Sequence, residues 1–153
     1  SSIIALSRQD LKVLNTSSTK RLSFYQNNFC NIVSGSLNKR DLTIVATGSE
    51  VEIGYEASLK LKKKGINSTV ISIPCIEQFN TLSSAKKSRI LGSSPIIFVE
   101  AGVSVGWRSI FKDNSNTVSV DTFGASGPKK DVYEHFKITK EEIVKKAIKF
   151  CSK

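Results

Sequence analysis

The chain has 153 residues, 39% of them hydrophobic, and a formal net charge of +10 at pH 7. A chain of this length can bury one ordinary hydrophobic core, so we expect one main domain. No stretch approaches the roughly 18 consecutive apolar residues of a membrane helix, and the first residues lack the basic start and long apolar body of a signal peptide. The composition therefore argues against a membrane partner and predicts a soluble protein.

The 23 lysines and arginines fall in separate segments instead of one block. A nucleic-acid interface needs cations on one face, often interleaved with aromatic residues that stack on bases, and the sequence shows no such interleaving. We therefore expect no nucleic-acid partner and interpret the lysines as solvated helix surfaces. A basic module that binds anions is the alternative.

The three cysteines, Cys30, Cys75 and Cys151, are widely spaced, and His135 is the single histidine. Without a CxxC pair these residues cannot assemble a zinc site. Reduced thiols fit better than a disulfide framework, so we expect a cytoplasmic protein. A cysteine nucleophile activated by His135 lacks a supporting motif, and we interpret His135 as a structural residue.

The chain starts with a short apolar run that ends in Leu6-Ser7-Arg8-Gln9, and a polar stretch, Thr16–Ser23, follows. We interpret residues 1–23 as the tail end of a preceding domain plus a linker, and residues 24–153 as the domain proper. Arg8 stands where a strand ends, and its planar fork of donors matches a phosphate or carboxylate group. The alternative is that Arg8 is one of many basic residues on a solvated surface.

Two β-rich runs come next. Phe29–Val33 is a short apolar element, and Leu42–Thr47 is typical of a buried strand. Only the polar stretch Ser34–Arg40 separates the two runs. Because this connection is short, we expect the two elements to form an antiparallel hairpin.

A helix is predicted over residues 51–64. Ser49 and Glu52 have the spacing of a capping box, and Gly65 stands where a left-handed residue ends a helix. The β-branched run Thr69–Ile73 supplies the next strand. A strand, a helix and a strand in this order predict a parallel βαβ unit.

The second half of the chain continues the alternation. We predict a short helix over Ser84–Leu91, a buried strand over Pro95–Val99 and a last strand over Thr117–Asp121. Thr139 and Glu142 repeat the capping-box spacing before a final helix. The apolar side of this helix carries Ile143, Val144, Ala147, Ile148, Phe150 and Cys151. The sum predicts a three-layer α/β/α domain with a mixed sheet of about five strands, mostly parallel with one antiparallel strand.

Ligands of open α/β sheets bind beyond the carboxyl ends of the strands. The segments expected there are Gly48-Ser49-Glu50, Pro74-Cys75, Glu100-Ala101-Gly102 and residues 121–128. None of them matches a dinucleotide fingerprint or a P-loop, so we interpret them as tight turns and helix caps.

Three carboxylates, Glu50, Glu100 and Asp121, also follow predicted strands, but their spacing brings no two of them together. Trp107 is interpreted as a packed or interface aromatic residue. From the residues alone we predict no catalytic, cofactor-binding or metal-binding side chain in this chain.

Six short segments, in the same order along the chain, resemble the C-terminal part of transketolases. They are Leu6-Ser7-Arg8-Gln9, Ala46–Val51, Val70–Pro74, Val99–Gly102, Gly106-Trp107, and Phe123–Ser126 with Pro128. Transketolases are thiamine-diphosphate enzymes of the pentose phosphate pathway, and the resemblance covers nearly the whole chain.

The resemblance implies a parent enzyme that moves a two-carbon ketol unit from a ketose phosphate to an aldose phosphate. It also implies that Arg8 binds the substrate phosphate. Thiamine diphosphate, a divalent metal (Mg or Ca) and the catalytic histidines belong to two upstream domains of the family. We therefore expect this chain to be a fragment of a homodimeric enzyme, inactive alone, with a structural, dimer-supporting and regulatory role.

The sequence departs from the family at three single positions and in the loop Lys112–Asn116, which matches weakly. Lys12 stands where proline is usual, Gly127 replaces an alanine, and Lys137 replaces the glycine that usually follows Phe136. Related thiamine-dependent enzymes share this domain type. Dihydroxyacetone synthase and the beta subunit of pyruvate dehydrogenase are therefore alternatives to transketolase.

Overall fold

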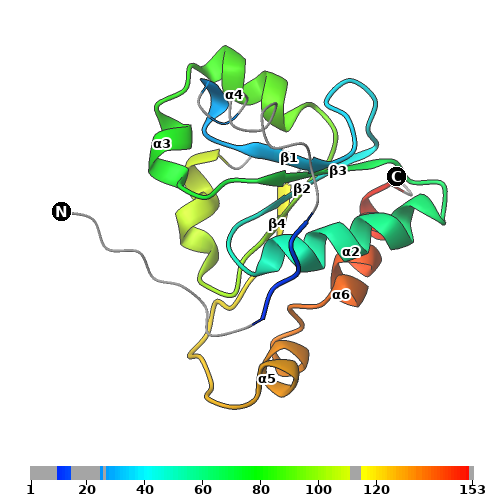
Figure 1. Cartoon of the computed structure of the whole chain (residues 1–153), viewed down its shortest axis with the longest axis vertical. Coiled ribbons are helices and arrows are strands. Elements are labelled where there is room, and N and C mark those ends of the chain that lie inside the picture. The colour runs from blue at the N-terminus through cyan, green and yellow to red at the C-terminus, as the bar shows by residue number, and fades with distance from the viewer. Residues whose placement is uncertain (1–9, 15–24, 26, 111–114, 152–153) are drawn as a thin grey trace.

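The computed structural model describes residues 10–14, 25, 27–110 and 115–151 (Figure 1). Five strands alternate with five α-helices and one 3₁₀ helix in the described part of the chain. In chain order the elements are β1 (Asn31–Ser34), β2 (Leu42–Ala46), α2 (Glu50–Lys62), β3 (Ser68–Ser72), α3 (Ile76–Asn80), α4 (Ser84–Leu91), β4 (Ile96–Val99), the 3₁₀ helix η1 (Ser104–Ile110), β5 (Ser115–Val118), α5 (Lys129–His135) and α6 (Lys140–Cys151).

The strands form one sheet in the order β1-β3-β2-β4-β5. β2, β3, β4 and β5 run parallel, and β1 pairs antiparallel with β3. The predicted mixed sheet is thus confirmed, but the predicted hairpin is wrong because β1 does not pair with β2. The crossover through α2 returns β3 to the side of β2 where β1 would lie, and β1 pairs with the far edge of β3 instead.

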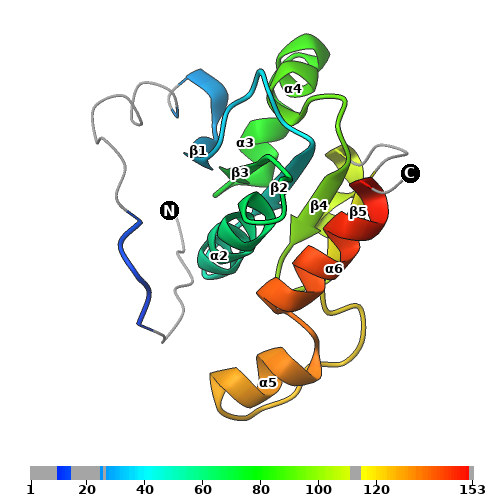
Figure 2. The ribbon, with the colours of Figure 1, turned by 90° about the vertical axis from the view of Figure 1, so that its right-hand side faces the viewer.

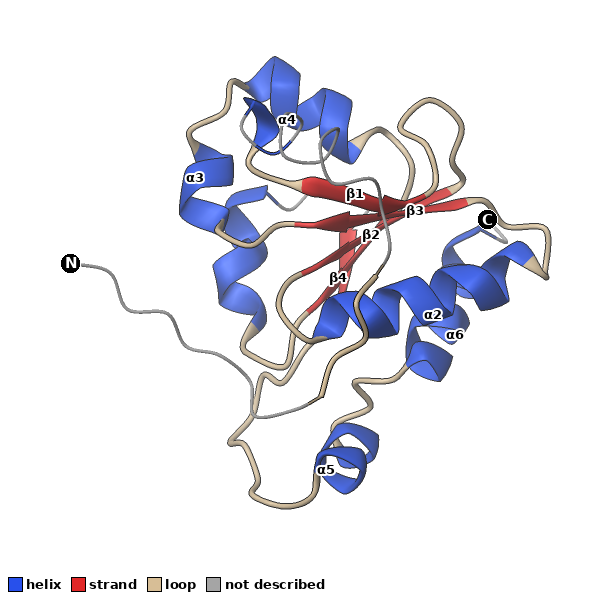
Figure 3. Cartoon of the chain, viewed as in Figure 1, coloured by secondary structure: helices blue, strands red, loops and turns tan. Residues whose placement is uncertain are grey.

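Helices cover both faces of the sheet (Figures 1 and 3). α2 and α6 pack on one face, and α3, α4 and η1 pack on the other. One core joins Leu42, Ile44 and Ala46 to Ala57, Leu61 and Ile143, and the second joins Val45, Ile71 and Phe98 to Phe79, Leu91 and Trp107. Alternate residues of β2 therefore face opposite helix layers, as the pleat of a central strand requires.

The central strands are buried on both faces, which explains their continuous apolar sequences. Every residue of β2 and of β4 is buried. α2 approaches this surface closely at Gly54, where a Cβ atom would lie 3.1 Å from Cγ2 of Ile44. Gly65 follows α2 with φ at +79°, so its predicted role as the residue that ends the helix is confirmed.

α5 and α6 are joined by a tight turn at Lys137. The Lys137 N–H donates to the carbonyl of Glu134, and the Ile138 N–H donates to the carbonyl of Tyr133, which is the Schellman pattern. Lys137 occupies its left-handed position with φ at +58°. Because this position favours glycine, the glycine usual in the family has a conformational reason here.

The predicted cap of the last helix is confirmed, because the Thr139 hydroxyl accepts from the Glu142 N–H at 3.3 Å. The predicted apolar face of this helix is only partly right. Ile143, Val144 and Ala147 are buried, whereas Ile148 is 37% exposed. Cys151 is exposed as well.

Both edge strands are short. β1 has four residues and an irregular register between Ile32 and Ser34. β5 lies two residues earlier than the expected last strand, because its parallel register with β4 starts at Ser115. The Lys146 ammonium donates to the carbonyl of Thr117 in β5.

Candidate functional site

The carboxyl ends of β2 and β4 mark the topological switch point of the sheet. From β2 the chain passes through α2 to β3 on one side, and β4 lies on the other side of β2. The segments Thr47–Glu50 and Glu100–Gly102 follow these two strands. Ligands of open α/β folds bind at such a point, so these two segments form the candidate ligand-binding site.

The Glu50 carboxylate is the centre of a buried hydrogen-bond cluster. Its side chain belongs to a residue only 5% exposed, and Oε1 accepts from the Ser49 hydroxyl at 2.6 Å and from the Tyr133 hydroxyl at 2.6 Å. The two hydroxyl oxygens lie 3.2 Å apart. Since Tyr133 is in α5, the cluster holds α5 against the first turn of α2 (Figure 2).

The predicted capping box at Ser49 is therefore wrong. Ser49 makes no side-chain cap hydrogen bond, and its φ of −66° and ψ of −23° are helical. A capping serine needs an extended ψ to aim its oxygen at the following amides. The Ser49 hydroxyl instead donates to the carboxylate of Glu50.

Glu100 lies close enough to Glu50 for their charges to interact, although the sequence spacing gave no sign of this. Burial raises the pKa of Glu100, contact with Trp107 opposes the rise, and the charge of Glu50 adds to it. Trp107 is 2% exposed and packs on Phe98 with ring centroids 5.3 Å apart. Its prediction as a packed aromatic residue is confirmed, and its indole N–H faces Glu100 without full hydrogen-bond geometry.

Asp121 has a different role from the two glutamates. Its carboxylate accepts from the Ser104 N–H and from the Ser119 hydroxyl, both at 2.7 Å. These hydrogen bonds, with that of the Ser104 backbone the strongest, lower the pKa of Asp121. Asp121 therefore ties the loop after β5 to the start of η1.

The glycine at this end of the sheet that needs a left-handed conformation is Gly48, with φ at +54°. It allows the turn between β2 and α2, as predicted. The N-terminus of α2 already carries two carboxylates in its first turn, Glu50 and Glu52. These negative charges complement the helix dipole and oppose a phosphate group at the same place.

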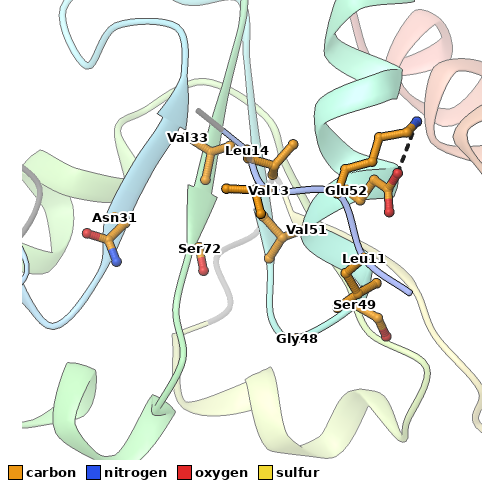
Figure 4. Close-up of a pocket in the computed structure, with 11 residues that line it drawn as sticks. Leu11, Val13, Leu14, Asn31, Val33, Gly48, Ser49, Val51, Glu52 and Ser72 are labelled. Atoms are coloured by element: carbon orange, nitrogen blue, oxygen red, sulfur yellow. Dashed lines mark ion pairs between the residues drawn. The ribbon is translucent and has the colours of Figure 1, made fainter. Parts of the chain in front are cut away.

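A cavity of about 310 Å³ lies between residues 11–14 and the carboxyl ends of β2 and β3 (Figure 4). Val13 and Leu14 face Val33 and Val51 across it. Val13 is nevertheless 88% exposed and Leu11 43% exposed, so this segment lies along the domain without being buried in it.

An ion-pair network fastens the same segment to the helices. Lys12 pairs with Glu52 at 3.2 Å and with Glu56 at 3.1 Å, and Glu56 also pairs with Lys140 of α6 at 2.6 Å. Hydrogen bonds from Lys140 and Lys12 lower the pKa of Glu56. The family departure at Lys12 thus places a cation between two carboxylates of α2.

Among the predicted site residues, Arg8 lies outside the described residues. His135 is exposed and meets the Phe136 ring edge-on, with ring centroids 4.8 Å apart. Burial raises the pKa of the Cys30 thiol to about 12, and Cys151 is exposed at the end of α6. The described side chains at the switch point hold α5 and the loops that follow the strands in place.

The five-stranded mixed sheet with helices on both faces defines a three-layer α/β/α domain. A sequence model of the family described as "Transketolase-like TK C-terminal domain" matches residues 31–139. The chain belongs to this family.

Relatives extend the match to nearly the whole chain. The chain is 36% identical to the transketolase of Sinorhizobium medicae over 96% of its own length and 21% of that protein. It is also 36% identical to a chloroplastic transketolase of Solanum tuberosum over 94% of its length and 19% of that protein. The chain thus spans about a fifth of the length of these relatives.

Solved structures agree in fold. A transketolase mutant from Pichia stipitis superposes with a TM-score of 0.79 at 29% identity, covering 95% of this chain and 20% of that one. The transketolase of Leishmania mexicana gives 0.73 at 30% identity, covering 84% and 19%. Within the described residues, no helix has the length and apolar character needed to cross a membrane.

Proposed function

We propose that this chain is the C-terminal domain of a transketolase that moves a two-carbon ketol unit from a ketose phosphate to an aldose phosphate. The observation that carries the proposal is the family match over residues 31–139 together with 36% identity to transketolases along 96% of the chain. Pichia stipitis transketolase has been solved with xylulose-5-phosphate, fructose-6-phosphate and sedoheptulose-7-phosphate. We assign the same class of phosphorylated sugars to the parent of this chain.

The thiamine diphosphate and its divalent cation belong, in this proposal, to parts of the enzyme outside the chain. Within the described residues, no three His, Cys, Asp or Glu side chains lie together in a way that could hold a metal ion. We assign no chemical step to these residues. Their proposed role is to support the enzyme's structure and its homodimer, and the cytoplasm is its proposed location.

The direct test is ketol transfer by the full-length parent protein with thiamine diphosphate and Mg²⁺. We expect transfer from a ketose phosphate to an aldose phosphate, and no turnover by the 153-residue chain alone. A parent that binds the cofactor but transfers no ketol unit would contradict the proposal.

Arg8 is proposed to bind the substrate phosphate. The Arg8→Gln parent should show a KM for phosphorylated substrates raised about tenfold, since a charge-assisted contact contributes about 1.5–3 kcal/mol. The KM for an unphosphorylated ketose should not change. Arg108→Gln, which removes an exposed arginine of η1, is the matched control. Equal effects on both kinds of substrate would contradict phosphate binding by Arg8.

A further inference from the structure

A second cavity lies at the opposite, amino end of the sheet, where the turn between β1 and β2 meets the end of α4. Its volume is about 730 Å³, within the range of small-molecule sites. In Figure 1 the cyan turn after β1 lies beside the loop that follows α4. The Ser94 hydroxyl donates to the carbonyl of Arg40 at 2.8 Å and joins the two segments.

The lining of this cavity is cationic and polar. Two arginines, Arg40 and Arg89, line it together with the polar residues Asn38 and Ser88. Its lining residues include no aspartate or glutamate. Among the described residues, no carboxylate lies within ion-pair distance of either arginine. Two cationic residues therefore line one cavity, and no carboxylate residue lines it with them.

The Arg40 side chain is half-buried and incompletely bonded. Its Nη2 donates to the carbonyl of Arg89 at a long 3.5 Å, while Nη1 is buried and has no hydrogen-bond partner in the described structure. If Arg40 served only to cap the carbonyls at the end of α4, the hydrogen bond of Nη2 would be explained, but the unbonded Nη1 would not. Leaving a buried charged donor unmet costs free energy, which the guanidinium would recover by turning Nη1 toward an acceptor bound in the cavity.

Gly92 leaves the space that the guanidinium occupies. A Cβ atom at this position would lie 2.2 Å from Nη2 of Arg40. Gly92 also has φ at +76°, a conformation that other residues rarely adopt. The lack of a side chain at Gly92 thus makes room for the Arg40 guanidinium beside the cavity.

We infer that this cavity binds the phosphate group of a small phosphorylated molecule, with Arg40 as the principal ligand and Arg89 as the second. A guanidinium fork matches phosphate geometry, and paired arginines are typical of such sites. The carbonyls at the end of α4 carry about half a negative charge, which would repel a phosphate group. The two positive charges of Arg40 and Arg89 outweigh it. The cavity volume exceeds that of a bare phosphate ion and leaves room for an attached sugar or similar group.

The test uses amide chemical shifts of the full chain. Inorganic phosphate should give saturable shifts in residues 37–40 and 88–94 with a Kd on the order of 1 mM. A sugar phosphate should bind the same residues more tightly than phosphate, whereas the unphosphorylated sugar should not bind. If inorganic phosphate alone binds, the site takes free phosphate, and the inferred room for a larger group is wrong.

Substitutions make the assignment specific. Arg40→Gln should weaken phosphate binding about tenfold or more, and Arg89→Gln by about three- to tenfold. Arg108→Gln removes the same charge elsewhere and should leave the Kd within about twofold. Thermal melting in chloride establishes that each variant is folded. If Arg40→Gln does not fold, Arg89→Gln decides the outcome alone.

Two results would overturn the proposal. One is the lack of saturable shifts in residues 37–40 and 88–94 with either phosphate or the sugar phosphate. The other is an equal loss of affinity in Arg108→Gln, which would show a diffuse field instead of a site. Binding of duplex DNA that falls steeply with salt, without binding of small phosphates, would also favour a different interface.

Discussion

The two ends of the central sheet differ in charge and in how that charge is used. At the carboxyl end, Glu50 and Glu100 lie near each other, and Oε1 of Glu50 accepts hydrogen bonds from Ser49 and Tyr133. At the amino end, Arg40 and Arg89 face a cavity whose lining residues include no carboxylate. The end where α/β folds usually bind ligands is thus acidic and internally bonded, and the opposite end offers unmet donors. The topology alone therefore does not identify which end suits an anion.

The largest expected loss of stability comes from a substitution at Gly35, where two backbone segments lie close together at the amino end of the sheet. In Gly35→Ala, the new Cβ would lie 2.5 Å from the carbonyl oxygen of Ser68 at a position where φ is +84°. We expect a loss of about 3 kcal/mol or more in the free energy of unfolding, measured with denaturant. Gly102→Ala at the carboxyl end is the control, because its Cβ would meet Glu100 at an ordinary 3.5 Å. If Gly35→Ala and Gly102→Ala lost similar free energy of unfolding, the two ends of the sheet would not differ in how closely the backbone packs.

The hydrogen bond between α5 and Glu50 should give the next largest effect. Tyr133→Phe removes a donor to a buried carboxylate and should lower the free energy of unfolding by about 2 kcal/mol. Tyr25→Phe is the control, because its hydroxyl donates to exposed Gln78 at 3.3 Å. An unchanged stability in Tyr133→Phe would show that the carboxyl end does not depend on this cluster.

A substitution in the turn after α5 should increase the stability of the fold, unlike the two substitutions above. Lys137→Gly relieves a left-handed lysine and should raise the free energy of unfolding by about 1 kcal/mol. Lys130→Gly, near the start of the same helix, should instead destabilise the chain, because glycine is a poor helix former. Loss of stability in both variants would refute the conformational reason given for the family's glycine.

The smallest effect depends on pH. Burial raises the pKa of Glu100 in the folded chain above its ordinary 4.5. A carboxyl group of this kind binds its proton more tightly when folded, so it stabilises the fold below pH 4.5. This contribution is lost as the pH rises through the folded pKa. Glu100→Gln should therefore gain stability relative to the wild type between pH 4.5 and neutrality. Melting temperatures across pH test this, and a constant difference would contradict it.

The sequence predicted the central strands well because each is a short apolar run, rich in β-branched residues and bounded by turn residues. The runs Leu42–Thr47, Thr69–Ile73 and Pro95–Val99 all became buried parallel strands, and the helix predicted over Ser84–Leu91 has those bounds. α3, η1 and α5 were missed. Two turns or fewer of helix do not reveal an apolar face in the sequence.

The long-range partners could not be predicted for a different reason. Glu50 meets Tyr133 across 83 residues, and Arg40 meets Arg89 across 49. These pairs depend on the order of the strands, which places the first turn of α2 near α5 and the segment before β2 near the end of α4. Local spacing contains no information about such pairs. Pro128 before a stretch with Val132, Tyr133 and Phe136 was the available sign of α5.

Both edges of the sheet are protected against the addition of further strands. The four residues of β1 are interrupted by a register shift, and the polar strand β5 has one of its carbonyls bonded to Lys146. Short, irregular and lysine-covered edges give incoming chains little to pair with. Association of folded copies through the edges of their sheets is therefore disfavoured, and the folded chain should remain dispersed even when concentrated.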